Sequence, residues 1–386
     1  MGPATLRDMT EHAWRGYLVG YAFETAAWVL ALTAAPFLAL AAGPGWVAAG
    51  AVLGVGPRLA SPWLARWVAA DPLVRLALAE ALAALVFLGA AGFGSRVPGA
   101  AALAVYGFAG AVGVLEGVVG PLLVAAGRAE REWTRANAVL TAVSLGLPVA
   151  VWPLAGTLTQ RAGLGVALGA AAALLGVRAL GLARLGPVRG AFSPALPAGR
   201  GSGPRSLARF WPLGVALAGA FSLLGYLQVK VPLWLDAQGR GPQALGSYGA
   251  AFSGGMLLGA AGVWALGFVR EDRLLRGALL LAALGALGLT DPVGLRLAAG
   301  AALLGAGLSG VQAAGTTLLQ RRLTGVALGA VVGWIAGAGA AATALGAALA
   351  GLLPGLLPGA WNPAVPALAA ALAGAGWVGL ARAGRQ

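Results

Sequence analysis

The sequence has 386 residues, of which 59% are hydrophobic and only 10% are charged, and its mean hydropathy is +0.84. An ordinary soluble domain carries about 25% charged residues, so this composition excludes one. Cys is absent, which excludes disulfides, thiolate metal sites and cysteine nucleophiles. A net charge of +14 would indicate a nucleic-acid partner in a soluble protein. Here the basic residues are dispersed between apolar segments, so we expect anionic lipid headgroups as their partner.

Twelve apolar stretches fill the chain almost from end to end. A membrane-spanning helix needs about 20 apolar residues, so twelve spans leave no room for a soluble catalytic domain. The first six spans are predicted at 16–36, 45–65, 73–94, 99–126, 134–159 and 163–185. The second six are predicted at 210–235, 243–268, 274–290, 293–319, 325–353 and 363–381. Residues 1–15 are predicted to be a polar tail ahead of an uncleaved first helix.

The segment between the sixth and seventh spans is rich in Pro, Gly and Arg, which is typical of a semi-flexible linker. We therefore predict an N-terminal six-helix half at 1–185, a cytoplasmic linker at 186–208 and a C-terminal six-helix half at 209–386. The fold class is an all-α membrane protein with 12 transmembrane helices.

The basic residues indicate the orientation of the spans, because Lys and Arg accumulate in cytoplasmic loops. If the N-terminus is cytoplasmic, 21 of the 26 basic residues fall on the cytoplasmic side. That set includes Arg178, near the end of the sixth span. Both termini and the linker are therefore predicted to be cytoplasmic. The remaining basic residues are Arg96, Arg161, Lys230, Arg240 and Arg296.

Three glutamates lie inside predicted spans. A charge at the centre of a span costs about 2.5 to 3.5 kcal/mol on insertion scales, and such residues usually have a function. Glu24 lies close to the middle of the first span and Glu116 close to the middle of the fourth. Glu80 lies nearer the cytoplasmic end of the third span, where we expect a structural ion pair. Its candidate partners are Arg58, Arg66 and Arg75.

Other polar and aromatic side chains are candidates for a substrate cavity. Lys230, the only lysine, lies near the outer end of the seventh span, where it could face a cavity or extend its amine outward to the interface. Trp28 could likewise face lipid or a cavity. The complete set of predicted cavity residues is Tyr21, Trp28, Gln228, Lys230, Gln312 and Thr316.

Three passages resemble the major facilitator superfamily, and within it the drug and siderophore exporter branch that includes enterobactin exporters. Pro57 to Pro62, followed by Asp71 and Arg75, resembles the loop between the second and third spans of that branch. Glu130 to Ala138 (EREWTRANA) is similar to the start of its fifth span and is the most specific match. Thr317 to Arg321 (TLLQR) is similar to a run in the second half. The resemblance covers nearly the whole chain.

The resemblance implies two six-helix halves, each an inverted pair of three-helix repeats, which move about a central site. In such a fold the first, fourth, seventh and tenth spans line the cavity. Glu24 and Glu116 would then approach it from one half and Gln228, Lys230 and Gln312 from the other. The family's acidic coupling residue corresponds to Glu24. The implied cytoplasmic gate consists of Arg58, Asp71, Arg75, Glu80, Arg131 and Arg135.

These features predict proton-coupled efflux, by antiport, of a small amphipathic or cationic solute of the multidrug or siderophore kind. Proton and substrate would compete for Glu24, aided by Glu116. No P-loop is present, so we expect no cofactor and a proton gradient as the energy source. Uptake, lysolipid flipping and a degenerate membrane sensor remain alternatives, whereas an enzyme would need nucleophiles or ligands that this chain lacks. We expect a monomer in the bacterial inner membrane.

Overall fold

The computed structural model describes residues 6–60, 64, 67, 71–127, 133–185, 211–266, 269–290, 295–322, 325–352 and 364–383, and throughout these ranges the regular structure is helical. The chain divides into two compact units, Met1–Ala195 and Leu196–Gln386. The first unit contains α1 (Leu6–Leu40), α2 (Pro44–Leu59), α4 (Pro72–Phe93), α5 (Pro98–Gly127), α6 (Trp133–Ala162) and α7 (Leu164–Leu185). The second contains α9 (Trp211–Ala237), α10 (Gly241–Ala265), α11 (Glu271–Gly288), α12 (Leu295–Arg322), α13 (Gly325–Leu352) and α14 (Ala364–Ala383).

These twelve helices confirm the twelve predicted spans. Most boundaries agree within a few residues, because the Pro and Gly residues used to separate spans also begin or end the helices. Pro44 and Pro72 occupy first helical positions, where the missing N–H of proline would have no partner within the helix. Gly43 and Gly163, with φ of 127° and 93°, make the turns that follow α1 and α6.

One predicted boundary is wrong at the N-terminus. α1 begins at Leu6, ten residues before the predicted start of the first span at Gly16. The intervening residues are polar but include good helix formers, such as Arg7 and Glu11. Hydropathy locates the membrane crossing and not the helix, so it misses a helix that continues into a polar segment. The predicted linker at 186–208 lies outside the described residues.

Membrane-crossing potential can be judged for the described helices by length and hydropathy. Within the ranges given above, six helical segments are long and apolar enough to span a bilayer. They are Trp14–Leu40, Pro72–Phe93, Pro98–Gly117, Val139–Ala162, Leu164–Leu185 and Leu295–Gly315. Five of the six belong to the first unit. Many leucines on these helices are exposed, Leu85 on α4 at 65% for example, as expected of side chains that face lipid.

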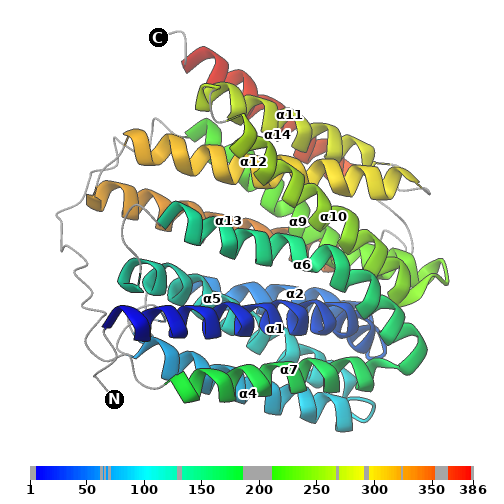
Figure 1. The fold of residues 1–386 in the computed structure, drawn as a ribbon. Helices are drawn as coiled ribbons and strands as arrows, with labels where there is room; N and C mark the ends of the chain where they lie inside the picture. Colours follow the sequence, from blue (N-terminus) through cyan, green and yellow to red (C-terminus); the bar gives the residue numbers. More distant parts are fainter. Residues whose placement is uncertain are drawn as a thin grey trace. The chain divides into compact units, whose positions relative to one another are not determined.

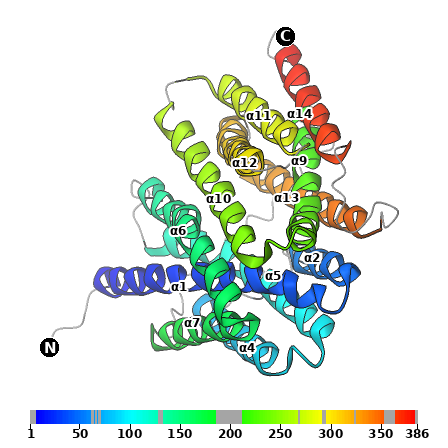
Figure 2. The ribbon, with the colours of Figure 1, turned by 90° about the vertical axis from the view of Figure 1, so that its right-hand side faces the viewer.

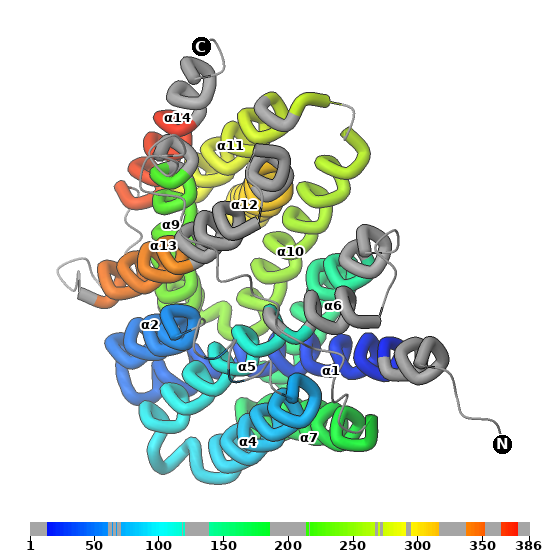
Figure 3. Tube along the Cα trace, turned by 90° about the vertical axis from the view of Figure 1, so that its left-hand side faces the viewer, coloured from blue at the N-terminus to red at the C-terminus, as the bar shows by residue number. Residues whose placement is uncertain are grey.

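The two units repeat one pattern of helix packing. In the first unit α1 contacts α6 and α7, α5 contacts α2 and α4, and α4 also contacts α7. In the second unit α9 contacts α13 and α14, α12 contacts α10 and α11, and α11 also contacts α14. Figure 1 shows α1, α4, α5 and α7 running lengthwise beside one another, and Figure 2 shows α12 between α10 and α11. The pairings of α4 with α7 and of α9 with α13 are also visible in Figure 3.

Glycines allow the closest helix contacts within each unit. A Cβ on Gly110 of α5 would lie 2.0 Å from the backbone oxygen of Gly54 on α2, and one on Gly255 of α10 would lie 1.9 Å from that of Ala302 on α12. Both distances are far inside van der Waals contact. Helices in lipid associate through such close packing, because lipid tails provide no hydrophobic drive between them.

Candidate functional site: a buried Glu–Arg cluster

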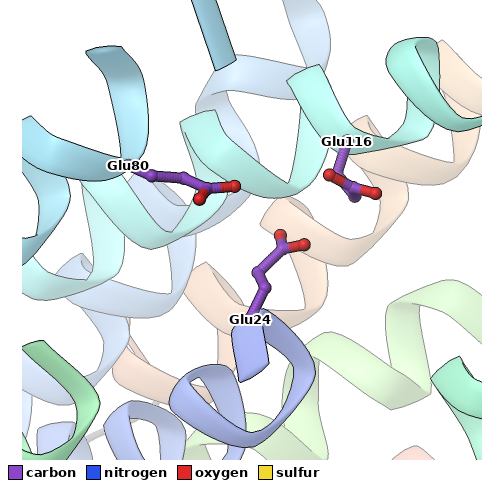
Figure 4. Close-up of side chains that lie close together, drawn as sticks. All are labelled: Glu24, Glu80 and Glu116. Carbon is purple, nitrogen blue, oxygen red and sulfur yellow. The ribbon is translucent and has the colours of Figure 1, made fainter. Parts of the chain in front are cut away.

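Four charged side chains meet inside the first unit, each from a different helix. Glu24 comes from α1, Glu80 from α4, Glu116 from α5 and Arg178 from α7, and all four are buried, with exposed fractions of 2%, 0%, 7% and 1%. Figure 4 shows the three carboxylates pointing toward one another. One carboxylate oxygen from each glutamate lies within 4.8 Å of the others. Each of these four helices packs against two of the others, α1 and α4 both contacting α5 and α7, so together they enclose a polar centre.

Arg178 forms ion pairs with all three glutamates. Its Nη1 donates a hydrogen bond to Oε2 of Glu24, and its Nη2 donates one to Oε2 of Glu116 at 2.6 Å. Oε1 of Glu80 lies 3.0 Å from the same Nη1. Arginine suits this position because its planar guanidinium presents several donors in a fixed fork, whereas lysine would provide one compact charge.

Two neighbouring side chains complete the hydrogen bonds of Glu24 and Glu116. Trp28 Nε1 donates to Oε1 of Glu24 at 2.9 Å, and the Tyr17 hydroxyl donates to Oε1 of Glu116. Both oxygens of each of these two carboxylates therefore accept a hydrogen bond. Buried polar groups need such partners, because an unsatisfied one costs about 1 to 3 kcal/mol.

Aromatic rings on α1 line one side of the cluster. The Cζ of Arg178 lies 5.7 Å from the ring centroid of Tyr17 and 5.9 Å from that of Tyr21. The two tyrosine rings are stacked, with centroids 6.1 Å apart. Tyr17, Tyr21, Glu24 and Trp28 recur at intervals of three or four residues, which places them along one face of α1. A cation at this position is thus stabilised by carboxylates and by ring faces together.

The cluster has an excess of negative charge. With all four groups ionised, three carboxylates and one guanidinium leave a net charge of −2. Several kcal/mol is the effective penalty for each uncompensated ion in a protein interior. Protons or a bound cation would neutralise this excess. Glutamate oxygens at this spacing are suitable ligands for a divalent metal ion, although four of the six oxygens already accept hydrogen bonds and a fifth, Oε1 of Glu80, is ion-paired with Arg178.

Arg178 is the member of this cluster that the sequence analysis did not single out as a site residue. It was assigned to the cytoplasmic set of basic residues, but it lies about two turns before α7 ends at Leu185 and is buried. That assignment is wrong, and the cytoplasmic count falls to 20 of 26. The signal was available, since Arg178 is a charge inside the apolar run predicted as the sixth span.

Glu80 also differs from its predicted surroundings. We expected it to pair with a loop arginine, but its ion-pair partner is Arg178. The prediction that Glu80 lies in the third span is correct, but the predicted direction of its side chain is wrong. Glu80 points into the bundle toward α5 and α7. The alternative partners lie elsewhere, since Arg58 is exposed at the end of α2, Arg75 packs over the ring of Trp67 at 5.1 Å, and Arg66 lies outside the described residues.

The remaining gate candidates are spread over the ends of helices. Asp71 is the residue before α4, and its side chain forms no capping hydrogen bond. Arg75 donates a hydrogen bond to the backbone oxygen of Trp67. Arg131 lies outside the described residues, as does the side chain of Arg135 on α6. The gate therefore stays a prediction.

Some of the predicted cavity residues lie in the first unit and the others in the second. Tyr21 and Trp28 are half-buried on α1, next to the cluster. In the second unit Lys230 is buried on α9, whereas Gln228 on α9 and Gln312 on α12 are exposed. The side chain of Thr316 is not among those that the structure describes. The approach of the second-unit residues to Glu24 stays a prediction.

A groove of about 700 Å³ lies on the first unit between α4 and α7. It is lined by apolar and small side chains, among them Leu78, Leu85, Gly169 and Gly176, and none of the predicted cavity residues contributes to it. Its exposed leucines are typical of a lipid-facing surface, so we do not assign it to the solute.

Comparison with known proteins identifies the fold to which this chain is similar. No family model and no curated protein matches this sequence. Solved structures do match over almost the entire chain. A bacterial homologue of the iron transporter ferroportin in the inward-facing state has a TM-score of 0.70 and 17% identity, covering 97% of this chain and 99% of that one. At this identity the likeness concerns the fold alone.

Two further structures support the same conclusion. A POT family transporter in complex with a thioalcohol-conjugated peptide has a TM-score of 0.72 and 11% identity, with 94% of each chain covered. The nucleoside transporter NupG has a TM-score of 0.64 and 13% identity, covering 99% of this chain and 100% of that one. At such identities these likenesses show the major facilitator fold, which is a multi-pass membrane fold, and not a family or a substrate.

Proposed function

We propose that the protein is a secondary active transporter that uses a proton gradient to export a small amphipathic or cationic solute. The observation that carries this proposal is the buried network in which Arg178 bridges Glu24 and Glu116. A structural bundle core would be more stable with apolar side chains at these positions. Charges inside the membrane region are expensive, and in transporters they mark proton and substrate paths. The fold is shared with solved transporters of nucleosides, peptides and metals.

Proton coupling follows from the balance of charge in this network. Adding a proton to Glu24 removes one acceptor of Arg178, so the guanidinium is free to turn toward another carboxylate. Helices α1 and α7 are joined by that ion pair, and a change in it alters their packing. Proton binding and helix rearrangement are linked in this way without a cofactor, as alternating access requires.

A cationic solute fits the chemistry around Arg178. The stacked rings of Tyr17 and Tyr21 and the carboxylate of Glu24 contact a planar, delocalised cation in the structure, namely the guanidinium itself. An organic cation that displaced the guanidinium from Glu24 would find the same two sources of stabilisation. Solute and proton then compete for Glu24, which couples their movements in opposite directions.

A divalent metal ion is a second candidate substrate. The buried oxygens of Glu24, Glu80 and Glu116 lie within 4.8 Å of one another, and a bacterial metal transporter has this fold with a TM-score of 0.67 at 16% identity, covering 97% of this chain and 99% of that one. Arg178 opposes this candidate, because its positive charge occupies the position between the carboxylates.

Efflux and orientation rest on sequence features. The three passages that resemble drug and siderophore exporters favour export over uptake or lysolipid flipping. With Arg178 removed from the count, 20 of the 26 basic residues still fall on one side, which supports a cytoplasmic position for both termini. We place the protein in a bacterial inner membrane on the same grounds.

Flux in proteoliposomes with an imposed pH gradient tests the proposal. The solutes are a fluorescent organic cation and Mn²⁺, and the variants are Glu24→Gln and, as a matched control, Asp236→Asn at an exposed position at the end of α9. We expect gradient-driven flux of the organic cation in the wild type and in Asp236→Asn, and its loss in Glu24→Gln. Full gradient-driven flux in Glu24→Gln would contradict a coupling role for this carboxylate. Flux of Mn²⁺ alone would favour the metal candidate.

A further inference from the structure

Glu80 differs from the other two glutamates in its hydrogen bonds. Glu24 and Glu116 each accept a hydrogen bond on both carboxylate oxygens. Among the described residues, neither oxygen of Glu80 has a hydrogen-bond partner, although its side chain is fully buried. Its contact with Nη1 of Arg178 at 3.0 Å is an ion pair without hydrogen-bond geometry. Figure 4 shows that the carboxyl group nevertheless points into the cluster.

This difference separates the protonation states of the three groups. A carboxylate is an acceptor only, and its charge is stabilised by the donors around it. Glu24 and Glu116 each accept hydrogen bonds from two donors, so the ionised form of each is stabilised. Glu80 has none, so its ionised form would be the least stabilised charge in the cluster. As a neutral carboxylic acid it needs no donor, and its own O–H becomes a donor toward the neighbouring carboxylates.

The charged groups that lie near Glu80 come from three other helices. α1 contributes Glu24, α5 contributes Glu116, and α7 contributes Arg178. Arg178 is the one cation among these groups, and two ionised carboxylates already share it. A third ionised carboxylate would therefore remain uncompensated.

We propose that Glu80 holds the resident proton of this cluster and passes it to Glu24 when Arg178 changes partner. Nη1 of Arg178 lies against both Glu24 and Glu80, so one nitrogen serves the two carboxylates. As Nη1 moves from Glu24 to Glu80, the O–H bond of Glu80 breaks and an O–H bond forms on Glu24. The proton and the ion pair thus exchange between α4 and α1, and the net charge of the cluster stays constant. This inference rests on the proposed proton coupling and names its second carboxyl group.

Infrared difference spectroscopy of the purified full-length protein in lipid tests this assignment without any solute. The carbonyl stretch of a protonated, buried carboxyl group is resolved from that of carboxylates, and it reports the resident proton directly. We expect one such band in the wild type at neutral pH, its loss in Glu80→Gln and its retention in Glu116→Gln. Glu24→Gln, which frees Nη1 for Glu80, should weaken the band. Persistence in Glu80→Gln or loss in Glu116→Gln would overturn the assignment.

A second variant covers the case in which Glu80→Gln does not fold. Glu80→Asp keeps a carboxyl group, so the band should remain with a shifted frequency, and an unchanged frequency would contradict the proposal. Titration of the same wild-type sample with Mn²⁺ alone adds a further arm. Stoichiometric Mn²⁺ binding that Glu80→Gln abolishes would replace the proton site with a metal site. Because the infrared band is measured in the absence of transport, its result does not depend on whether the protein transports the organic cation. Failure of this assignment and failure of the proposed function can therefore be distinguished.

Discussion

Nη1 of Arg178 on α7 lies 3.0 Å from Oε1 of Glu80 on α4, and both side chains are fully buried. The same guanidinium also pairs with Glu24 and Glu116. One cation thus joins side chains from four different helices. The four helices α1, α4, α5 and α7 have a common polar centre for this reason, and the predictions below test its part in stability and in the proposed coupling.

The first prediction concerns Arg178. Arg178→Gln leaves three buried carboxylates without a cation, and breaking a buried ion pair typically lowers the free energy of unfolding by about 3 to 5 kcal/mol. Thermal unfolding in detergent should show this loss, with Arg96→Gln, an exposed arginine before α5, as the control. Arg178→Lys should restore part of the stability, because lysine retains the charge but not the fork of donors. Equal melting of Arg178→Gln and Arg96→Gln would mean that the network does not stabilise the bundle.

The second prediction concerns the hydroxyl of Tyr17. Tyr17→Phe removes the donor to Oε1 of Glu116 while preserving the stacked ring. Leaving a buried acceptor unsatisfied should lower the free energy of unfolding by about 1 to 3 kcal/mol. The pH profile of proton-driven flux should also change, because Glu116 then accepts a hydrogen bond from Arg178 alone. Tyr21→Phe, which leaves this bond intact, is the comparison, and a larger effect there would argue against the Tyr17 assignment.

The third prediction concerns close packing between α2 and α5. Gly110→Ala places a Cβ against the backbone of Gly54, and overpacking of this kind costs about 1 to 3 kcal/mol. Gly117→Ala on the same helix provides a matched control, because a Cβ there has nothing within 4 Å. Melting curves of the two variants should differ by several degrees. Identical curves would show that α2 moves away from α5 at no cost.

The fourth prediction concerns Arg75. Its guanidinium lies over the ring of Trp67 and bonds to the backbone there, at an exposed site. Exposed charge contacts contribute little to stability, about 0 to 1 kcal/mol. Arg75→Ala should therefore insert and melt like the wild type while its solute turnover falls. Unchanged turnover would remove Arg75 from the cytoplasmic gate.

The fifth prediction concerns topology. The absence of Cys allows single cysteines to be introduced at Ser202, in the predicted linker, and at Gly359, in the last outer loop of the predicted topology. A membrane-impermeant reagent applied to intact cells should label Gly359→Cys and not Ser202→Cys. The opposite pattern would reverse the orientation derived from the basic residues.

Much of the fold follows from the sequence alone. The positions of the twelve helices are readable because a bilayer crossing needs a long apolar run, and Pro and Gly interrupt such runs at their ends. Glu24 and Glu116 could be selected as candidates for the same reason: a carboxylate in such a run is costly wherever its helix packs. These are local properties, determined by composition over about 20 residues.

Only the tertiary structure decided which charges meet. The spacing of Arg178 and Glu80 along the chain does not reveal which face of α7 or α4 turns inward, because the small and apolar residues around them are similar on every face. Side-chain partners across four helices depend on helix rotation and close packing, which hydropathy does not encode. The sequence therefore determined that the membrane region contains buried charge, and the packing of α1, α4, α5 and α7 decided that three carboxylates share a single arginine.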